Sequence, residues 1–331
     1  MNLNVLDVMK LCMAAVVVAI HTNPENNLDW KQGKEAIRII YTVAVPYFFM
    51  TSGFLLFKKA EFPLQTKIDK SRVRNYVIKI GRFYAIWTLL YLPMTIWGFA
   101  KEGTPFLKSV LIFVQNVLFV GENYSSWPLW YLLALIVAIL IVYVCSSLRL
   151  KWWHILLFAI LLHAFGLFLD HCRDYGLLSD ITNVYYSIFR TTRNGFFIGL
   201  IYVVLGMKLA HLQSNNKKRT TSIATVGILI GFIGSVYRYP FADVLFAYSL
   251  FVLTLQIPIN FLSITKCVYF RYLSMVIYLV HMYWVVLWSG LLPQSDMKSL
   301  GVFVLSLAFS ILSGILLYSC KDKVWFKFCF Q

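Results

Sequence analysis

Three ionisable residues stand in one apolar segment, LDVMKLCMAAVVVAIH, at positions 6–21. Asp7, Lys10 and His21 are a carboxylate, an amine and an imidazole among residues that otherwise suit lipid. In a helix, eleven residues make about three turns, so Lys10 and His21 lie within about 20° of each other around the axis. They are then separated by roughly 16 Å along the axis, and Asp7 shares their face. The spacing predicts one polar face that crosses most of a bilayer.

This polar face indicates a cavity or an active site inside a helix bundle, because ionisable side chains that face lipid are energetically costly. Histidine is the usual general base near neutral pH, since its ordinary pKa is about 6.5. The alternative is that Asp7 and Lys10 extend to water at the cytoplasmic boundary while His21 only ends the helix. Both interpretations stay open at this point.

The composition indicates which elements hold this face in place. Of the 331 residues, 60% are hydrophobic and 13% are charged, and apolar runs of about 20 residues recur along the chain. This pattern excludes a soluble domain and predicts an all-α, polytopic membrane protein, with residues 1–331 forming a single domain. About ten membrane spans are expected, at roughly 5–22, 35–57, 72–98, 128–147, 152–169, 186–208, 221–237, 241–261, 268–290 and 299–319.

The net charge of +16 is explained by where the basic residues fall. The loops after the second, fourth, sixth and eighth spans are basic, as in residues 58–74 and 215–219, whereas the opposite loops are mixed or acidic. The positive-inside rule then places both termini in the cytoplasm. We expect the positive charge to face membrane lipid and not nucleic acid. The six cysteines lack metal-ligand spacing, so no metal site is predicted.

The pattern of Lys10, ten intervening residues and His21 resembles the first span of the acyltransferase-3 family of bacterial membrane acyltransferases. Lysine stands where arginine is more usual in the family. Further segments resemble the family in its own order: VPYFFMTSGFLL (45–56), PLWYLLALI (128–136), RNGFFIGLIYVVLG (193–206) and LSMVIYLVH (273–281). The sequences AVPYFFMTSGF and TRNGFFIG are most similar to the branch that includes the membrane halves of serine transporter-racemases.

The resemblance implies the transfer of an acyl group, commonly acetyl, from cytoplasmic acyl-CoA to a hydroxyl of a cell-surface glycan or lipid-linked sugar. The implied location is the bacterial plasma membrane. In this reaction His21 is expected to be the base near the outer face, and Lys10, beside Asp7, is expected to order the inner end of the path. Direct transfer and a covalent acyl-histidine are alternatives, and the sequence specifies neither the acceptor nor the oligomeric state.

The donor, expected to be acetyl-CoA, brings phosphates that the segment KSRVRNYVIKIGR (70–82) could bind. Its basic residues are Lys70, Arg72, Arg74, Lys79 and Arg82. The family's R-x-x-x-R pattern, implied to bind acyl-CoA, is matched by Lys70 and Arg74 with one lysine substituted. A pattern that ends at Arg82 fails, because residue 78 is isoleucine. Anionic lipid would attract the same charges, which is the alternative to specific CoA contact.

Two further groups are candidates for supporting roles inside the bundle. Ser274, Tyr278 and His281 are spaced four and three residues apart, so they share one helical face and could order the site or contact the acceptor. A buried hydrogen bond to a neighbouring helix is the alternative for His281. Ser52 precedes Gly53 near the expected depth of Lys10, and helix packing through small residues is the alternative there.

The outer half of the expected span 186–208 carries Arg190, Arg193 and Asn194. Arginine at that depth needs water or a partner. Contact with the acceptor is one interpretation, and an ion pair with Asp174, Asp180 or Glu122 is the other. Trp130 could stack on a sugar ring, although aromatic residues are expected at a membrane interface in any case.

Two functions from different classes follow from these patterns. The first is an integral-membrane O-acyltransferase that modifies a cell-envelope polysaccharide. The second is a transporter of a small amino acid such as serine, suggested by the similarity to the transporter-racemase branch. The basic segment 70–82 favours the enzyme, because CoA phosphates need cationic contacts and a zwitterionic amino acid does not. An inert scaffold would not explain polar residues on a shared intramembrane face.

Overall fold

The computed structural model describes residues 4–211, 216–258, 262–295 and 297–330. Every regular element in these ranges is a helix, which confirms the prediction of an all-α protein. The longer helices are α1 (Asn4–Thr22), α2 (Lys31–Thr42), α3 (Ala44–Phe57), α4 (Lys67–Leu90), α5 (Leu92–Lys101), α6 (Phe106–Gln115), α7 (Trp130–Ser147), α8 (Trp152–Asp174), α9 (Ser179–Phe189), α10 (Leu200–Ala210), α11 (Lys217–Val236), α12 (Ala242–Gln256), α13 (Ile264–Leu291) and α14 (Lys298–Tyr318). The short ones are η1 (Pro24–Asn27), η2 (Asn116–Val120), η3 (Trp127–Leu129), η4 (Gly195–Gly199) and α15 (Val324–Phe330).

Seven helical stretches within the described ranges are long and apolar enough to cross a membrane, and an eighth results if α4 and α5, bent by 46°, form one span. The chain is therefore a multi-pass membrane protein. The expected spans 186–208 and 241–261 instead contain shorter apolar helices, residues 195–210 and α12. The 15 residues of α12 extend only about 22 Å, less than a hydrocarbon core of about 30 Å. The cytoplasmic position of the termini stays a prediction.

The expected span 186–208 is interrupted for a local reason. Helix α9 ends at Phe189 because Arg190 adopts a left-handed backbone with φ of 58°. A new helix then begins at Gly195, where the Asn194 side chain accepts hydrogen bonds from the amides of Phe196 and Phe197. Asparagine is a preferred residue for such an N-cap. The polar residues 190–194 are therefore a connection between helices and not part of one continuous span.

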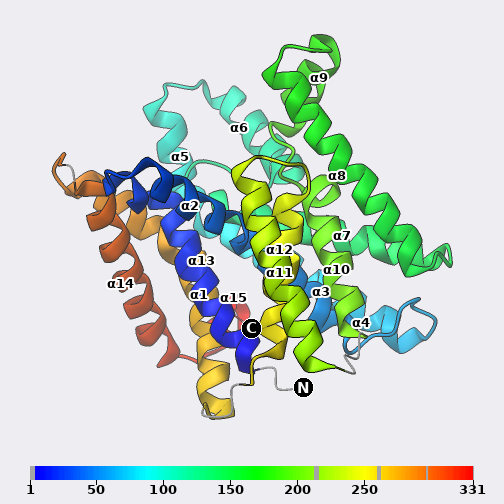
Figure 1. Cartoon of the computed structure of the whole chain (residues 1–331). Helices are drawn as coiled ribbons and strands as arrows, with labels where there is room; N and C mark the ends of the chain where they lie inside the picture. The colour runs from blue at the N-terminus through cyan, green and yellow to red at the C-terminus, as the bar shows by residue number, and fades with distance from the viewer. Residues whose placement is uncertain (1–3, 212–215, 259–261, 296, 331) are drawn as a thin grey trace. The chain divides into compact units, whose positions relative to one another are not determined.

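Two compact units make up the chain, and their boundary falls within α3. Unit 1 comprises residues 1–48 and 213–331, and unit 2 comprises residues 49–212. The colours of Figure 1 separate them: unit 1 holds the blue N-terminal helices and the yellow to red C-terminal ones. The expectation of a single domain stays a prediction.

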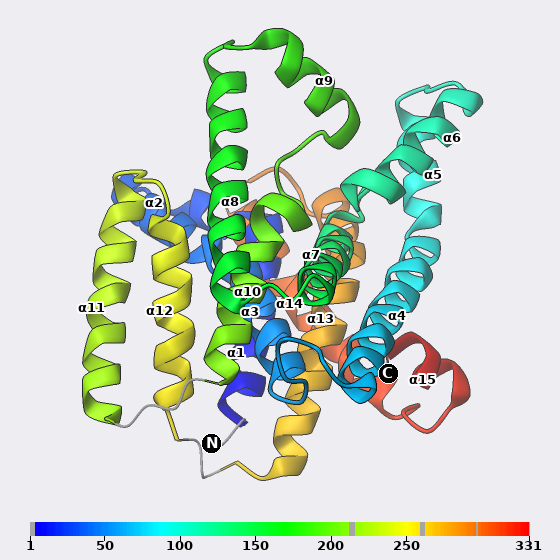
Figure 2. The ribbon, with the colours of Figure 1, turned by 90° about the vertical axis from the view of Figure 1, so that its right-hand side faces the viewer.

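In unit 1, α1 lies along α13, and α13 also packs against α14. Ala14 and Val18 of α1 meet Leu273 and Ile277 of α13 in a core whose members are at most 6% exposed. Burial of this apolar contact fixes the two helices against each other midway along α1. Helices α11 and α12 form an antiparallel hairpin that is visible in both Figure 1 and Figure 2.

In unit 2, α7 contacts α4, η4 and α10, and α8 contacts η4 and α10. Helices α3 and α10 meet at two glycines. A Cβ atom at Gly53 would collide with the Val203 carbonyl, and one at Gly206 would collide with the Met50 carbonyl. Small residues allow membrane helices this close approach. Gly53 is thus explained by helix packing, the alternative that its sequence context left open.

Candidate functional site in helices α1 and α13

Polar side chains of α1 contact partners at two levels along the helix. The first polar level, near the start of α1, is an ion pair inside unit 1. The Lys10 Nζ atom lies 2.8 Å from Asp7 Oδ1, and the two side chains are 12% and 4% exposed. The lysine therefore does not extend to water, contrary to the boundary alternative. It is held by a buried carboxylate one turn earlier on its own helix. The shared face predicted for Asp7 and Lys10 is observed.

Arg271 of α13 completes this level, and the sequence reasoning missed it. Its Nε donates to Asp7 Oδ1 at 2.9 Å and its Nη2 donates to Asp7 Oδ2 at 2.7 Å. This two-point contact is the strong geometry for an arginine and a carboxylate. Arg271 was counted among the basic loop residues after the eighth expected span. A usable signal was present, since it stands ten residues before His281, much as Lys10 stands eleven before His21.

The second polar level is a pair of imidazoles at the other end of the same helices. The rings of His21 and His281 are stacked, with centroids 5.3 Å apart and planes 29° apart. His281 is fully buried. Because Asp7 pairs with Arg271 and His21 with His281, α1 and α13 run parallel. The sequence placed His21 and His281 on separate faces of separate spans, and the fold brings them together.

The tautomer of His281 follows from its surroundings. Its Nδ1 lies 3.0 Å from the Ile277 carbonyl oxygen. A carbonyl can only accept, so in the neutral ring Nδ1 carries the hydrogen and Nε2 presents a lone pair. Within the described part of the chain, Nε2 is buried and has no hydrogen-bond partner. A buried acceptor without a donor is unfavourable, which indicates that a ligand or a water molecule donates to it.

The other two residues of the α13 motif support the helix. Ser274 is buried, and its hydroxyl donates to the Arg271 carbonyl at 2.8 Å. The Tyr278 ring packs edge-on against Phe48, with centroids 5.6 Å apart, and lies beside His281. All three motif residues are buried, as expected for one face of a core helix.

Three basic residues of α4 in unit 2 already contact other groups of the protein. Arg72 is used internally: it pairs with Asp69 at 3.1 Å and donates to the Lys59 carbonyl. Lys79 and Arg82 lie over the Phe83 ring, at 5.7 and 5.9 Å from its centroid.

Lys70 and Arg74 differ from Arg72, Lys79 and Arg82. Both are exposed, and neither has an ion pair with a described residue. They stand four residues apart, about 40° apart around the helix, so one ligand could contact both. Of the five predicted donor contacts, these two have neither an ion pair nor a ring contact with the described residues.

Ser52 lies in a hydroxyl cluster of unit 2. Its Oγ is 2.9 Å from the Tyr131 hydroxyl, and either group can donate. A serine nucleophile needs an adjacent base such as histidine, and a neutral phenol does not serve as one. The contact joins α3 to α7, so it indicates a supporting role for Ser52.

The residues expected to meet the acceptor are largely engaged with one another in unit 2. Arg193 pairs with Glu122 at 3.3 Å and lies 5.6 Å from the Trp130 ring centroid. Burial raises the pKa of the Glu122 carboxyl, and the nearby Arg193 and Arg190 oppose that shift. Trp130 is 9% exposed, which leaves little ring surface for a sugar. A cavity of about 290 Å³, otherwise lined by apolar residues, borders Trp130 and Asn194.

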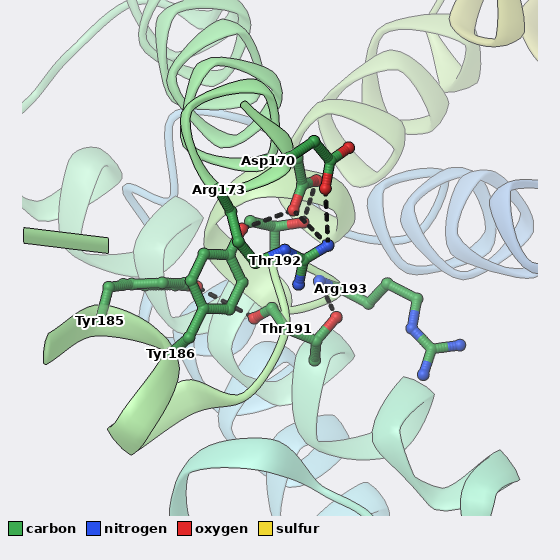
Figure 3. A network of polar contacts seen from close by, with 8 residues as sticks. Asp170, Arg173, Tyr185, Tyr186, Thr191, Thr192 and Arg193 are labelled. Atoms are coloured by element: carbon green, nitrogen blue, oxygen red, sulfur yellow. Dashed lines mark hydrogen bonds and ion pairs between the residues drawn. The ribbon is translucent and has the colours of Figure 1, made fainter. Parts of the chain in front are cut away.

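A network around Asp170 supports the same connection (Figure 3). Asp170 accepts hydrogen bonds from the Tyr186 hydroxyl at 2.5 Å and from the Thr192 hydroxyl at 2.6 Å. Asn194, which caps η4, donates to the Tyr185 hydroxyl at 2.9 Å. Burial raises the pKa of Tyr185 to about 12, so this phenol stays neutral. The network ties α8, α9 and the segment before η4 together.

Comparison with known proteins identifies the family of this chain. A family model described as an acyltransferase domain matches residues 3–319. The chain belongs to the acyltransferase-3 family. The resemblance of the segments around Lys10, His21 and His281 is thereby confirmed at the level of the whole chain.

Two curated relatives are similar to part of this chain. An amino-acid racemase of Enterococcus faecalis is 29% identical over 220 residues, covering 65% of this chain and 29% of the relative. A serine/alanine racemase of Enterococcus gallinarum is 31% identical over 251 residues, covering 72% of this chain and 33% of the relative. The matched part is thus about a third of each relative. No solved structure matches the chain significantly.

The structure shows where the acyltransferase-3 segments lie. The segment 45–56 is within α3, and 128–136 covers η3 and the start of α7. The segment 193–206 contains the N-cap, η4 and most of α10, and 273–281 is the middle of α13. In this family member, each segment either packs helices closely or carries one of the polar groups described above.

Proposed function

We propose that the protein is a membrane O-acyltransferase of the bacterial plasma membrane. It moves an acyl group, commonly acetyl, from cytoplasmic acyl-CoA to a hydroxyl of a cell-surface glycan or lipid-linked sugar. The observation that supports this best is the parallel pair α1–α13. It holds a stacked imidazole pair at one level and a charged cluster at the other, with an apolar core between them.

His21 is the general base in this proposal. A sugar hydroxyl is a poor nucleophile until a base removes its proton, and histidine suits that role near neutral pH. As the imidazole takes the proton, the hydroxyl oxygen bonds to the thioester carbonyl carbon. The carbon–sulfur bond then breaks, and the proton passes to the CoA thiolate. The products are the acyl ester and CoA, and His21 returns to its neutral form.

His281 is a positioning residue beside the base. Its ring stacks on that of His21, and its Nδ1 is held by the Ile277 carbonyl. The lone pair on Nε2 can accept a hydrogen bond from a hydroxyl of the acceptor. Because Nε2 is buried in this conformation, an acceptor hydroxyl reaches it only after the acceptor enters between the helices, where His21 deprotonates another of its hydroxyls.

The donor contacts in the proposal are Lys70 and Arg74. Phosphate groups are bound by cations whose donors are not already occupied, and hydrogen bonds to charged groups contribute about 1.5–3 kcal/mol each. The charge of Arg72 is balanced by Asp69, and its Nη1 also donates to the Lys59 carbonyl, whereas Lys70 and Arg74 have no ion pair with a described residue. We therefore assign Arg72 to the structure of the segment and Lys70 and Arg74 to the acyl-CoA.

The test is acetyl-CoA binding and slow acetyl-CoA hydrolysis by the purified protein in detergent. His21→Ala should keep binding and lose turnover by about 10²–10⁴-fold, the usual contribution of a general base. Lys70→Ala/Arg74→Ala should weaken binding, whereas Arg72→Ala, if folded, should bind normally. Wild-type protein that is folded but does not bind acetyl-CoA would contradict the proposal.

The alternative function is transport of a small amino acid such as serine. It is suggested by the relative named serine/alanine racemase, which is about three times as long as the matched region. Uptake of labelled serine into liposomes containing the protein tests this alternative directly. Uptake that is abolished by His21→Ala, without acetyl-CoA binding, would favour the transporter.

A further inference from the structure

The Asp7 carboxylate is shared by two cations. Lys10 Nζ lies 2.8 Å from Oδ1, and Arg271 Nη2 lies 2.7 Å from Oδ2. One carboxylate neutralises one cation, so the three side chains together keep one positive charge. The buried Lys10–Asp7 pair would already be neutral without Arg271. The second cation is therefore not explained by charge neutralisation.

The excess charge is on the member that a ligand can reach. The Arg271 side chain is 56% exposed, whereas those of Lys10 and Asp7 are 12% and 4% exposed. Arg271 uses Nε and Nη2 on Asp7. Its Nη1 has two N–H donors that make no hydrogen bond with the residues the structure describes. Asp7 thus fixes one edge of the guanidinium and leaves the other edge available.

The backbone adds to this positive potential. Asp7 lies in the first turn of α1, whereas Arg271 lies seven residues after the start of α13, about two turns into that helix. The N-terminus of a helix carries a partial positive charge that favours anions nearby. The exposed guanidinium edge, held by Asp7 in the first turn of α1, suits the oxygen atoms of a phosphate.

We propose that Arg271 is an anion-binding residue, held in place by Asp7, that takes a phosphate or pyrophosphate oxygen of the acyl donor. The assignment to the donor rests on the proposed function. The anion site itself rests on the geometry of Asp7, Lys10 and Arg271. Because Lys10 and Asp7 still pair when Arg271 is replaced, the site can be removed with little disturbance of the buried pair.

The experiment measures binding of inorganic pyrophosphate and, separately, of acetyl-CoA to the purified full chain by calorimetry at low salt. Arg271→Gln should weaken pyrophosphate binding by about tenfold or more, and Arg271→Lys should weaken it less, since charge is kept and the fork is lost. Lys218→Gln is the matched control. It removes an exposed basic residue from α11, on the side of the membrane predicted to be the same, and should bind like wild type.

The variant Asp7→Asn distinguishes two interpretations of the Asp7–Arg271 contact, an anion-binding site and a purely structural contact. Arg271→Gln and Asp7→Asn both break the pair between α1 and α13, so a purely structural contact predicts a loss of binding in both. The anion site predicts unequal effects: Arg271→Gln removes the guanidinium, whereas Asp7→Asn keeps it and adds net positive charge but fixes it less well, so Asp7→Asn should bind more tightly per folded molecule than Arg271→Gln. If Asp7→Asn does not fold, the test is the order of pyrophosphate affinities. The anion site predicts that wild type binds most tightly, Arg271→Lys less tightly and Arg271→Gln least tightly.

The two ligands separate the two proposals. Pyrophosphate binding that depends on Arg271, with no binding of acetyl-CoA, supports the anion site and contradicts the proposed donor. Acetyl-CoA binding that is unchanged in Arg271→Gln, together with unchanged pyrophosphate binding, overturns the anion site and leaves the proposed function standing. Loss of both ligands in Arg271→Gln but not in Lys218→Gln supports both.

Discussion

Two aspartates join separate segments of this protein, and they do so with different partners. Asp7 in unit 1 is 2% exposed and is bound by two cations, Lys10 and Arg271. Asp170 in unit 2 accepts from two neutral hydroxyls, those of Tyr186 and Thr192.

The charge balance of the two clusters differs as well. Arg173 lies 3.9 Å from Asp170 and 3.5 Å from Asp174, so these three side chains together keep one negative charge. The Asp7 cluster keeps one positive charge on a half-exposed arginine. The Asp170 side chain is 36% exposed, so water solvates its charge, and its two hydroxyl donors help to hold the connection between helices in one conformation. Excess charge beside a carboxylate that is only 4% exposed is retained at a greater energetic cost, and we infer that the Asp7 cluster serves a ligand while the Asp170 network serves the fold.

The largest expected effect is on stability at the Asp7 cluster. Asp7→Asn leaves Lys10 as a buried charge without its counter-ion, which should lower the free energy of unfolding by about 3–5 kcal/mol. Thermal unfolding in detergent measures this. The double variant Asp7→Asn/Lys10→Met removes the buried cation as well and should recover most of the loss. A single variant as stable as wild type would show that the pair is not effectively buried.

The next effect concerns the lone pair of His281. His281→Asn keeps an amide near the position of Nδ1 but loses the acceptor at Nε2. The rate of acetyl transfer or hydrolysis should fall about tenfold, which corresponds to the loss of roughly one hydrogen bond. His281→Gln places an amide oxygen near Nε2 and should retain more activity than the asparagine variant. Acetyl-CoA binding should be unchanged in both. Equal activities of the two variants would contradict a role for the Nε2 acceptor.

A smaller effect is expected at the second aspartate. Asp170→Asn keeps an acceptor oxygen but no longer serves both hydroxyls equally well, so stability should fall by about 1 kcal/mol. Turnover and acetyl-CoA binding, compared at a temperature where the variant is folded, should stay within about twofold of wild type. A large loss of acetyl-CoA binding without unfolding would remove the contrast between the two aspartates.

The smallest effect is expected at Arg72. Its ion pair with Asp69 joins a side chain that is 50% exposed, and such surface pairs contribute about 0–1 kcal/mol. Arg72→Gln should therefore change the unfolding temperature little and leave acetyl-CoA affinity unchanged, while Lys70→Gln weakens it. An Arg72 variant that lost affinity while Lys70→Gln did not would reverse the assignment of the two groups.

Local sequence patterns predicted much of the fold and the family of this protein. Apolar runs predicted its helical membrane class, because a segment crossing lipid must satisfy its own backbone hydrogen bonds. The spacing within α1 predicted a shared face for Asp7 and Lys10, and the motif order predicted the family. The sequence was less informative at residues 190–194. There, a left-handed Arg190 and the cap formed by Asn194 divide what hydropathy alone presents as one span.

What the sequence by itself determined is therefore what depends on neighbours along the chain: helix type, amphipathic faces and lipid-facing length. Only the tertiary structure decided that Arg271 pairs with Asp7, 264 residues away, and that His281 stacks on His21. The tertiary structure also decided that Arg72 contacts Asp69 and the Lys59 carbonyl, whereas Lys70 and Arg74 have no ion pair with a described residue. Charge partners and stacked rings depend on which helices pack together and in what register, and no periodicity within one helix contains that information.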